Sequence, residues 1–180
     1  PFGETSLDNP KGSLFVIDLE QMNIRPLALN SLAYPSGLAL SLNEKNIYVC
    51  ETCSNRILRF TLTPSGGYLS SVFYQFSGRF GPTAIAVSQS DQIYVARYEF
   101  ATNATDGLIS VINKQGQPIA EITVPFAPEI TGLGFSKFKP SVLYITENSN
   151  SPQCIRTFVD KEENQPDKSK TDINTSFKGQ

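Results

Sequence analysis

The stretch of sequence that decides the fold is Tyr34-Pro35-Ser36-Gly37-Leu38-Ala39-Leu40-Ser41, which is followed by Asn46-Ile47-Tyr48-Val49. Two later stretches, residues 81–88 with 92–95 and residues 129–136 with 142–145, repeat the pattern of a small-residue run followed by an apolar run containing a tyrosine. The shared tyrosines are Tyr48, Tyr94 and Tyr144, which are 46 and 50 residues apart. A period of about 40–50 residues with several short strands per unit is typical of a β-propeller blade.

Each unit divides into short β-branched and aromatic runs separated by polar turns, which predicts strands. The strands predicted for the first two units cover residues 38–41, 46–50, 56–61, 68–76, 84–88, 92–97, 107–113 and 119–124. No stretch of ten residues combines a helical period with helix caps. The sequence therefore predicts an all-β chain built as part of a propeller.

The two ends of the chain predict incomplete blades. Residues 12–18 resemble the third strand of a blade and residues 24–29 the fourth, whereas residues 155–159 begin a third strand after 129–136 and 142–145. We therefore expect a partial propeller over residues 1–159, with two full blades and two partial ones. Residues 160–180 are polar and charged, which predicts a solvated, disordered tail.

An open array of blades has a consequence for partners. Natural propellers have about 4–8 blades, and an open array exposes apolar faces and strand edges at each end. We expect the ring to be completed either by a second copy or by the remaining blades of the same propeller. The chain begins at Pro1 without an initiator Met, which predicts a removed leader or a longer polypeptide.

Composition excludes several classes of protein. Apolar residues make up 39% of the 180, the net charge is −2 and there is no histidine. These values exclude a wholly disordered chain and give no basic field for nucleic acid. No apolar run is long enough for a membrane span. Acid/base, nucleophilic and metal chemistry that depends on histidine is excluded as well.

The cysteines and two glycosylation sequons bear on the cellular compartment. Cys50 and Cys53 have CxxC spacing, but they lie where an apolar run ends rather than at a helix N-terminus, so with Cys154 we interpret them as ordinary thiols. Asn103-Ala104-Thr105 and Asn174-Thr175-Ser176 fit the N-glycosylation pattern. They favour a secreted or lumenal glycoprotein over a cytoplasmic location.

The blade motifs resemble the strictosidine-synthase-like branch of the gluconolactonase-type (luciferin-regenerating-like) six-bladed β-propeller superfamily. The resemblance covers about residues 12–158. The stretches that carry it are residues 34–41, Tyr48-Val49-Cys50-Glu51-Thr52, Asn55-Arg56-Ile57-Leu58-Arg59-Phe60, Gly81-Pro82-Thr83, residues 93–97, residues 130–135 and residues 143–147.

The resemblance implies a set of functional positions at the starts of the inner strands. In the metal-dependent lactonases, Asn and Asp there hold a calcium-type cation together with a Glu from the first blade, because hard divalent cations need several oxygen ligands. The matching residues here are Ser36 and Thr83, which are not anionic. In the strictosidine-forming enzymes a Glu at the last inner strand does acid/base work. The matching residue is Thr131, with Glu129 two positions earlier.

These positions give five candidate site residues. Ser36, Thr83 and Thr131 form a ring of hydroxyls that binds a small polar ligand or, equally, only satisfies strand-end backbone groups. Arg97 follows a second strand and serves either in ligand binding or in an ion pair. Glu129 is the candidate catalytic carboxylate, because burial at a channel mouth would raise its pKa and favour proton transfer.

Two main functions follow from this interpretation, and a third class, an extracellular interaction protein that uses the loop-bearing face of the propeller, is favoured by the sequons and by the long loop over residues 98–106. The favoured one is a binding or scaffold module that lacks the family metal site and needs no cofactor. The alternative is part of an active lactone-hydrolase-type or condensing enzyme, whose acidic or metal-binding residues lie in blades outside this chain and hold a divalent cation such as calcium. The sequence leaves open whether the chain belongs to an enzyme.

Overall fold

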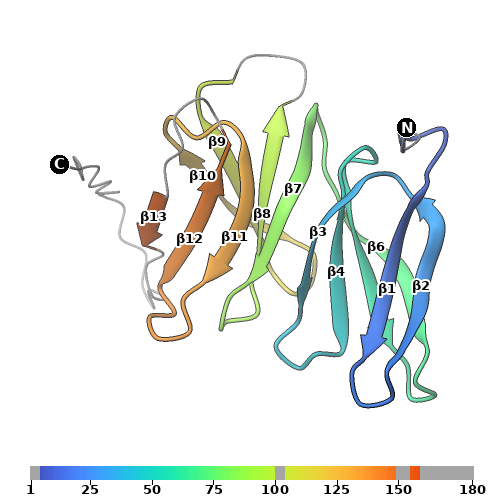
Figure 1. Cartoon of the computed structure of the whole chain (residues 1–180). Coiled ribbons are helices and arrows are strands. Elements are labelled where there is room, and N and C mark those ends of the chain that lie inside the picture. Colours follow the sequence, from blue (N-terminus) through green and yellow to red (C-terminus); the bar gives the residue numbers. More distant parts are fainter. Residues whose placement is uncertain (1–4, 100–103, 149–154, 159–180) are drawn as a thin grey trace.

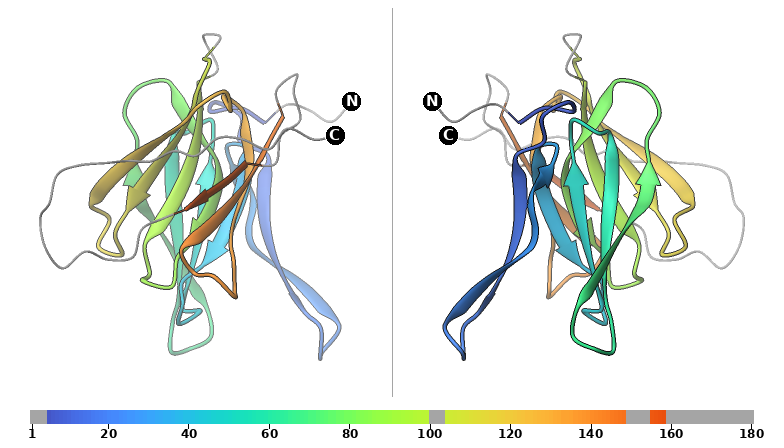
Figure 2. Two further views of the ribbon diagram at one scale, coloured as in Figure 1. Left: turned by 90° about the vertical axis from the view of Figure 1, so that its left-hand side faces the viewer. Right: turned by 90° about the vertical axis from the view of Figure 1, so that its right-hand side faces the viewer.

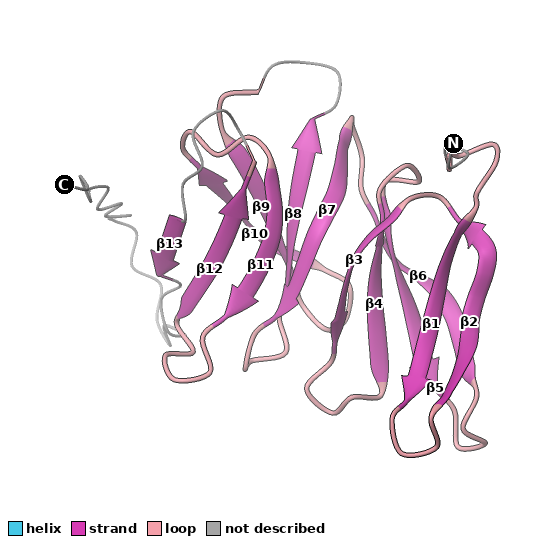
Figure 3. Ribbon diagram, in the orientation of Figure 1, coloured by secondary structure: helices cyan, strands magenta, loops and turns pink. Residues whose placement is uncertain are grey.

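A computed structural model describes residues 5–99, 104–148 and 155–158. These residues form thirteen β-strands and no helix, as Figure 3 shows. The strands are β1 (Gly12–Asp18), β2 (Asn23–Leu32), β3 (Pro35–Leu40), β4 (Asn46–Glu51), β5 (Arg56–Leu62), β6 (Tyr68–Gln75), β7 (Phe80–Val87), β8 (Ile93–Glu99), β9 (Gly107–Ile112), β10 (Pro118–Val124), β11 (Ile130–Phe135), β12 (Val142–Glu147) and β13 (Ile155–Phe158). The predicted all-β class is confirmed.

The strands form four antiparallel sheets in chain order. Two sheets have four strands, β3-β4-β5-β6 and β7-β8-β9-β10, and they are flanked by the two-stranded β1-β2 and the three-stranded β11-β12-β13. The sheets follow one another as neighbouring blades, with β3, β7 and β11 as the inner strands (Figures 1 and 2). The predicted partial propeller, with two full and two partial blades, is confirmed.

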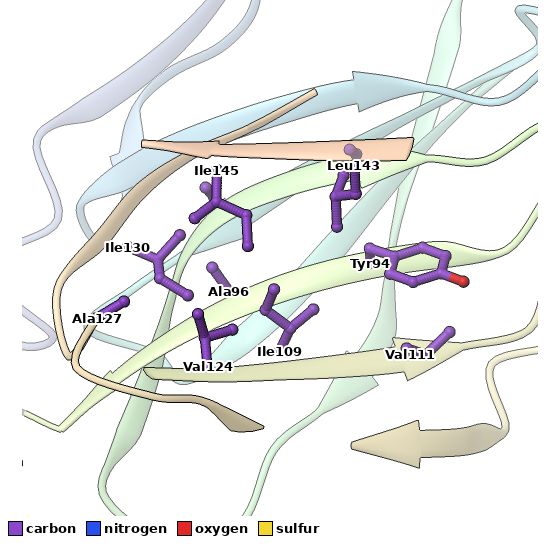
Figure 4. Packing of buried hydrophobic residues seen from close by; sticks show 11 residues of the cluster. Tyr94, Ala96, Ile109, Val111, Val124, Ala127, Ile130, Leu143 and Ile145 are labelled. Carbon is purple, nitrogen blue, oxygen red and sulfur yellow. The ribbon is translucent and has the colours of Figure 1, made fainter. Parts of the chain in front are cut away.

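Three apolar clusters lie between successive blades. The cluster in Figure 4 joins Ala96 and Ile109 of the β7–β10 blade to Leu143 and Ile145 of the following sheet. The ring of Tyr94 also meets Phe135 across this junction, edge to face, with 5.0 Å between ring centroids. The middle strands β4 and β8 are covered on both faces, so their sequences are nearly continuous apolar runs.

Inner strands begin earlier than the sequence predicts. The prediction started them at Leu38 and Ala84, whereas β3 begins at Pro35 and β7 at Phe80. A register shift separates Pro35 from Gly37, another separates Pro82 from Ala84, and a third separates Ile130 from Gly132. Such a bulge leaves one residue of the inner strand outside the ladder. The residues left out are Ser36, Thr83 and Thr131.

Three further predictions concern membrane spans and the C-terminal part of the chain. No helix in the described residues is long and apolar enough to cross a membrane. The tail expected at residues 160–180 lies outside the described residues, so the division at residue 159 stays a prediction. The third strand expected in the last blade is present as β13.

Candidate functional site

The three candidate hydroxyls lie at equivalent places, at the bulge near the start of each inner strand. Ser36 Oγ donates a hydrogen bond to the Pro82 carbonyl, 3.1 Å away. Thr83 Oγ1 donates in the same way to the Ile130 carbonyl at 2.8 Å. Each acceptor lies on the next inner strand, directly before that strand's own hydroxyl residue. These hydroxyls therefore connect neighbouring blades.

A fourth hydroxyl joins this network. Thr52, in the turn between β4 and β5, places Oγ1 2.7 Å from the Pro82 carbonyl and 2.8 Å from Ser36 Oγ. Thr131 Oγ1 lies 3.1 Å from Thr146 Oγ1 on the neighbouring strand of its own blade. The donor protons of Ser36 and Thr83 are used by backbone carbonyls, so toward a ligand these two oxygens offer acceptor lone pairs. Ligand binding by the three hydroxyls stays a prediction.

Arg97 is buried, and it contacts the segment that connects the two full blades. Its Nη2 donates to the carbonyls of Ser77 at 3.0 Å and Phe80 at 3.1 Å, and its Nε donates to Phe80 at 3.2 Å. The guanidinium also lies 4.3 Å from the centroid of the Phe76 ring. Burial lowers the pKa of Arg97, and the nearby carboxylate of Glu121 opposes that shift. These contacts hold the connection between β6 and β7; a ligand-binding role for Arg97 stays a prediction.

Glu129 lies at the junction that the Thr83 hydroxyl bridges. It directly precedes the acceptor Ile130, and its own carbonyl accepts a hydrogen bond from the Asn148 amide at 3.0 Å. The residue is half-buried. Among the described residues, no group donates a hydrogen bond to its carboxylate. A catalytic role for Glu129 stays a prediction.

A small pocket at the same end of the blades was not predicted. Its volume is about 450 Å³, which is within the usual size of small-molecule sites. Its lining comes from three connections that are separate in sequence and from the start of β7: Tyr34, Thr52, Cys53, Asn55, Gly78, Arg79 and Gly81. No local motif links these residues, and only the packing of the β3–β6 blade against β7 brings them together.

The described residues do not fit a divalent cation. They contain no group of three or more Cys, Asp or Glu side chains placed to hold a metal ion. At the two matching positions Ser36 and Thr83 supply neutral oxygens, and both are already hydrogen-bonded to carbonyls. Cys50 and Cys53 are free thiols, the first buried and the second exposed, and Cys154 lies outside the described residues.

Comparison with known proteins places these features in a family. Residues 2–149 match the model of the SMP-30/Gluconolactonase/LRE-like region. The chain is 32% identical to lactonase drp35 of Staphylococcus haemolyticus and 35% identical to that of Staphylococcus saprophyticus, in each case over 121 residues. Both matches cover 65% of this chain and 35% of the relative. The chain thus spans about a third of the length of these relatives.

Solved structures show the same fold. A calcium-binding protein, regucalcin, from Agrobacterium tumefaciens matches 77% of this chain and 45% of its own, with 21% identity and a TM-score of 0.64. The gluconolactonase XC5397 from Xanthomonas campestris matches 80% and 43%, with 19% identity and a TM-score of 0.61. At these identities the likeness concerns the fold alone.

The comparisons correct the favoured functional reading. The favoured binding or scaffold module that lacks the family metal site is wrong, because the relatives that are 32% and 35% identical to this chain over 121 residues are named lactonases. That reading rested on the neutral residues at positions 36 and 83, which describe these blades and not a complete ring. The resemblance to gluconolactonase-type propellers is confirmed, and the chain belongs to the SMP-30/gluconolactonase/LRE-like family.

Proposed function

We propose that this chain forms part of an enzyme that hydrolyses a lactone. The observation that carries the proposal is the identity of 31–35% to lactonases named drp35 over about two thirds of the chain. The gluconolactonase fold of the solved structures is consistent with it. Lactone hydrolysis adds water to the ring carbonyl and breaks the ring C–O bond, which yields a hydroxy acid.

The described blades would supply one wall of the site without its cation. A divalent cation such as calcium needs several oxygen ligands, preferably carboxylates, and Ser36 and Thr83 do not provide them. The carboxylates would therefore come from blades outside this chain. The calcium-binding neighbour with the same fold supports a cation in the complete ring.

Glu129 would act on protons at this wall. A carboxylate can take a proton from the water as it attacks the ring carbonyl and, when the ring C–O bond breaks, donate that proton to the departing alkoxide oxygen. Glu129 suits this role because it is half-buried and its carboxylate accepts no hydrogen bond from the described residues. The lone pairs of the Ser36 and Thr83 hydroxyls would accept hydrogen bonds from a polyhydroxylated substrate.

The test is acid release from gluconolactone, followed in a pH-stat with the native protein purified from its source. We expect hydrolysis above the spontaneous rate, loss of activity with EDTA and recovery with calcium. Glu129→Gln should slow hydrolysis by about 10²-fold or more, whereas Glu44→Gln, in the exposed turn between β3 and β4, should leave it unchanged. Spontaneous rates in the presence of calcium would contradict the proposal.

A secreted or lumenal location is part of the same proposal and rests on the two sequons alone. Asn103 and Asn174 both lie outside the described residues. Glycan mapping of the native protein tests it: occupied sequons are expected, and a chain without glycan at both sites would favour the cytoplasm.

A further inference from the structure

The pocket beside the hydroxyl network is lined at two positions by residues without a side chain. Gly78 lies shortly before β7, and Gly81 lies within it. When the bulge residues of β7 and β11 are aligned, these two glycines correspond to Phe126 and Glu129 at the next junction. A Cβ added at Gly78 would meet no atom within 4 Å. The sequence therefore leaves space at this junction where the next one carries two large side chains.

Hydrogen bonds between the connections hold the walls of the pocket in place. The side-chain amide of Asn55 donates to the Gly78 carbonyl at 2.9 Å. The backbone amide of Thr52 donates to the Tyr34 carbonyl at 3.0 Å. Tyr34 and Asn55 have φ angles of 61° and 53°, which are uncommon for residues other than glycine. The walls are therefore fixed before a ligand enters, which lowers the entropy cost of binding.

The lining of the pocket favours an organic anion. Arg79 is its charged residue, and no Asp or Glu is among the described residues that line it. A guanidinium can pair with a carboxylate through two parallel hydrogen bonds. Its five N–H donors let Arg79 serve a ligand while it keeps a contact within the chain. Most of the remaining lining is apolar, and an inorganic anion would leave that surface uncovered.

The pocket adjoins the hydroxyl network through Thr52. This residue lines the pocket, and its Oγ1 lies 2.7 Å from the Pro82 carbonyl and 2.8 Å from Ser36 Oγ. Gly81, another lining residue, directly precedes Pro82. A ligand in the pocket would therefore lie against the contacts that join β3 to β7.

We propose that this pocket binds a small organic carboxylate. The carboxylate pairs with Arg79, and the apolar body of the ligand lies against the ring of Tyr34 and the glycine backbone. Among the described residues, no group forms a hydrogen bond with the Tyr34 hydroxyl, so this hydroxyl can bond to a polar substituent of the ligand. The proposal does not involve Glu129, so it holds or fails independently of lactone hydrolysis.

The thiol of Cys53 reports whether the pocket is occupied. Cys53 lines the pocket and is exposed, whereas Cys50 is buried. We measure the rate at which iodoacetamide alkylates Cys53 in the native protein, purified from its source, by mass spectrometry of the peptide that contains it. Benzoate is the probe, and benzamide, which has nearly the same shape without the charge, is the control.

Saturating benzoate should slow the alkylation of Cys53 by at least about five-fold, because a bound ligand covers the thiol. Benzamide at the same concentration should leave the rate unchanged. No slowing by benzoate, or equal slowing by benzamide, would overturn the proposal. Inorganic phosphate that slows alkylation as strongly as benzoate would reveal an anion site without preference for an organic ligand, and would also overturn it.

Matched variants of the native protein locate the bound carboxylate. In each variant the rate with benzoate is divided by the rate without it, so a change in the reactivity of the thiol itself does not count. Arg79→Gln should abolish the effect of benzoate, and Arg79→Lys should keep part of it because the charge remains. Arg25→Gln, at an exposed site on β2, is the control and should leave the effect unchanged. Protection that survives Arg79→Gln, or that Arg25→Gln abolishes equally, would contradict binding at Arg79.

Discussion

Arg97 is a buried charged residue, and its position in the sequence repeat does not show what it contacts. Three hydrogen bonds to the Ser77 and Phe80 carbonyls and the adjacent Phe76 ring account for its burial. Replacing a buried donor leaves its acceptors without partners, which costs more than the net value of the bonds.

Arg97→Met should therefore lower the free energy of unfolding by about 2–3 kcal/mol. Urea denaturation of the chain measures it. Arg25→Met, at an exposed site on β2, should change stability by less than about 0.5 kcal/mol. Equal losses in the two variants would mean that the Arg97 hydrogen bonds contribute no specific stability.

Thr83 and Thr131 occupy equivalent positions but have different partners. Thr83→Val removes the bond to the Ile130 carbonyl, so it should cost about 1 kcal/mol in urea denaturation of the isolated chain. Thr131→Val removes only an exposed contact with Thr146 and should cost less. A larger loss of unfolding free energy for Thr131→Val than for Thr83→Val would contradict the role of the Thr83 hydroxyl in joining the two blades by a hydrogen bond.

Cys50 makes stability depend on alkaline pH. Burial raises the pKa of its thiol above the ordinary value of 9.0, so above that pH the unfolded chain loses a proton that the folded chain keeps. The stability is fully present below pH 9 and should fall above it by about 1.4 kcal/mol per pH unit from this group. Burial raises the pKa of Tyr94 as well, which adds to the fall from about pH 10.

The measurement is urea denaturation of the chain between pH 8 and 10.5. Cys50→Ala should be less stable throughout because it opens a cavity, but its stability should fall less steeply between pH 9 and 10. Parallel pH profiles for the two proteins would show that the Cys50 thiol does not cause the loss.

At the scale of strands, the space around two glycines decides whether a larger residue can replace them. Gly107 begins β9 against the carbonyl of Ala127 and the side chain of Ile130, so an added Cβ would overlap the carbonyl oxygen. A Cβ at Gly134 of β11 would meet no atom within 4 Å. Gly107→Ala should therefore lower the free energy of unfolding by about 1–3 kcal/mol, and Gly134→Ala should leave it unchanged or raise it. Thermal denaturation followed by circular dichroism measures both; a stable Gly107→Ala would contradict this packing.

The sequence predicts the strands better than it predicts their starts or contacts. The sequence repeat places Ser36, Thr83 and Thr131 at equivalent positions, as the structure does. It can do so because the alternation of apolar and polar residues and the turn residues are local signals. Pro35 and Pro82 argue against a strand locally, yet both are paired. The acceptors of the Ser36 and Thr83 hydroxyls lie 46 and 47 residues away, so these contacts depend on how the blades stack, which periodicity alone does not give.

At the scale of the whole molecule, the chain is part of a propeller ring whose inner strands carry the hydroxyls of Ser36, Thr83 and Thr131. The same repeat that fixes the blades leaves leucines exposed at one end and places no cluster of carboxylates among the described residues. In the proposed enzyme, this chain contributes blades, hydroxyls and Glu129, and the cation comes with the rest of the ring.

Calcium titration calorimetry, run in parallel on the native protein and on the isolated 180-residue chain, tests this division most directly. The account predicts stoichiometric calcium binding by the native protein and no measurable binding by the isolated chain. Tight stoichiometric binding by the isolated chain, or no binding by the native protein, would contradict it.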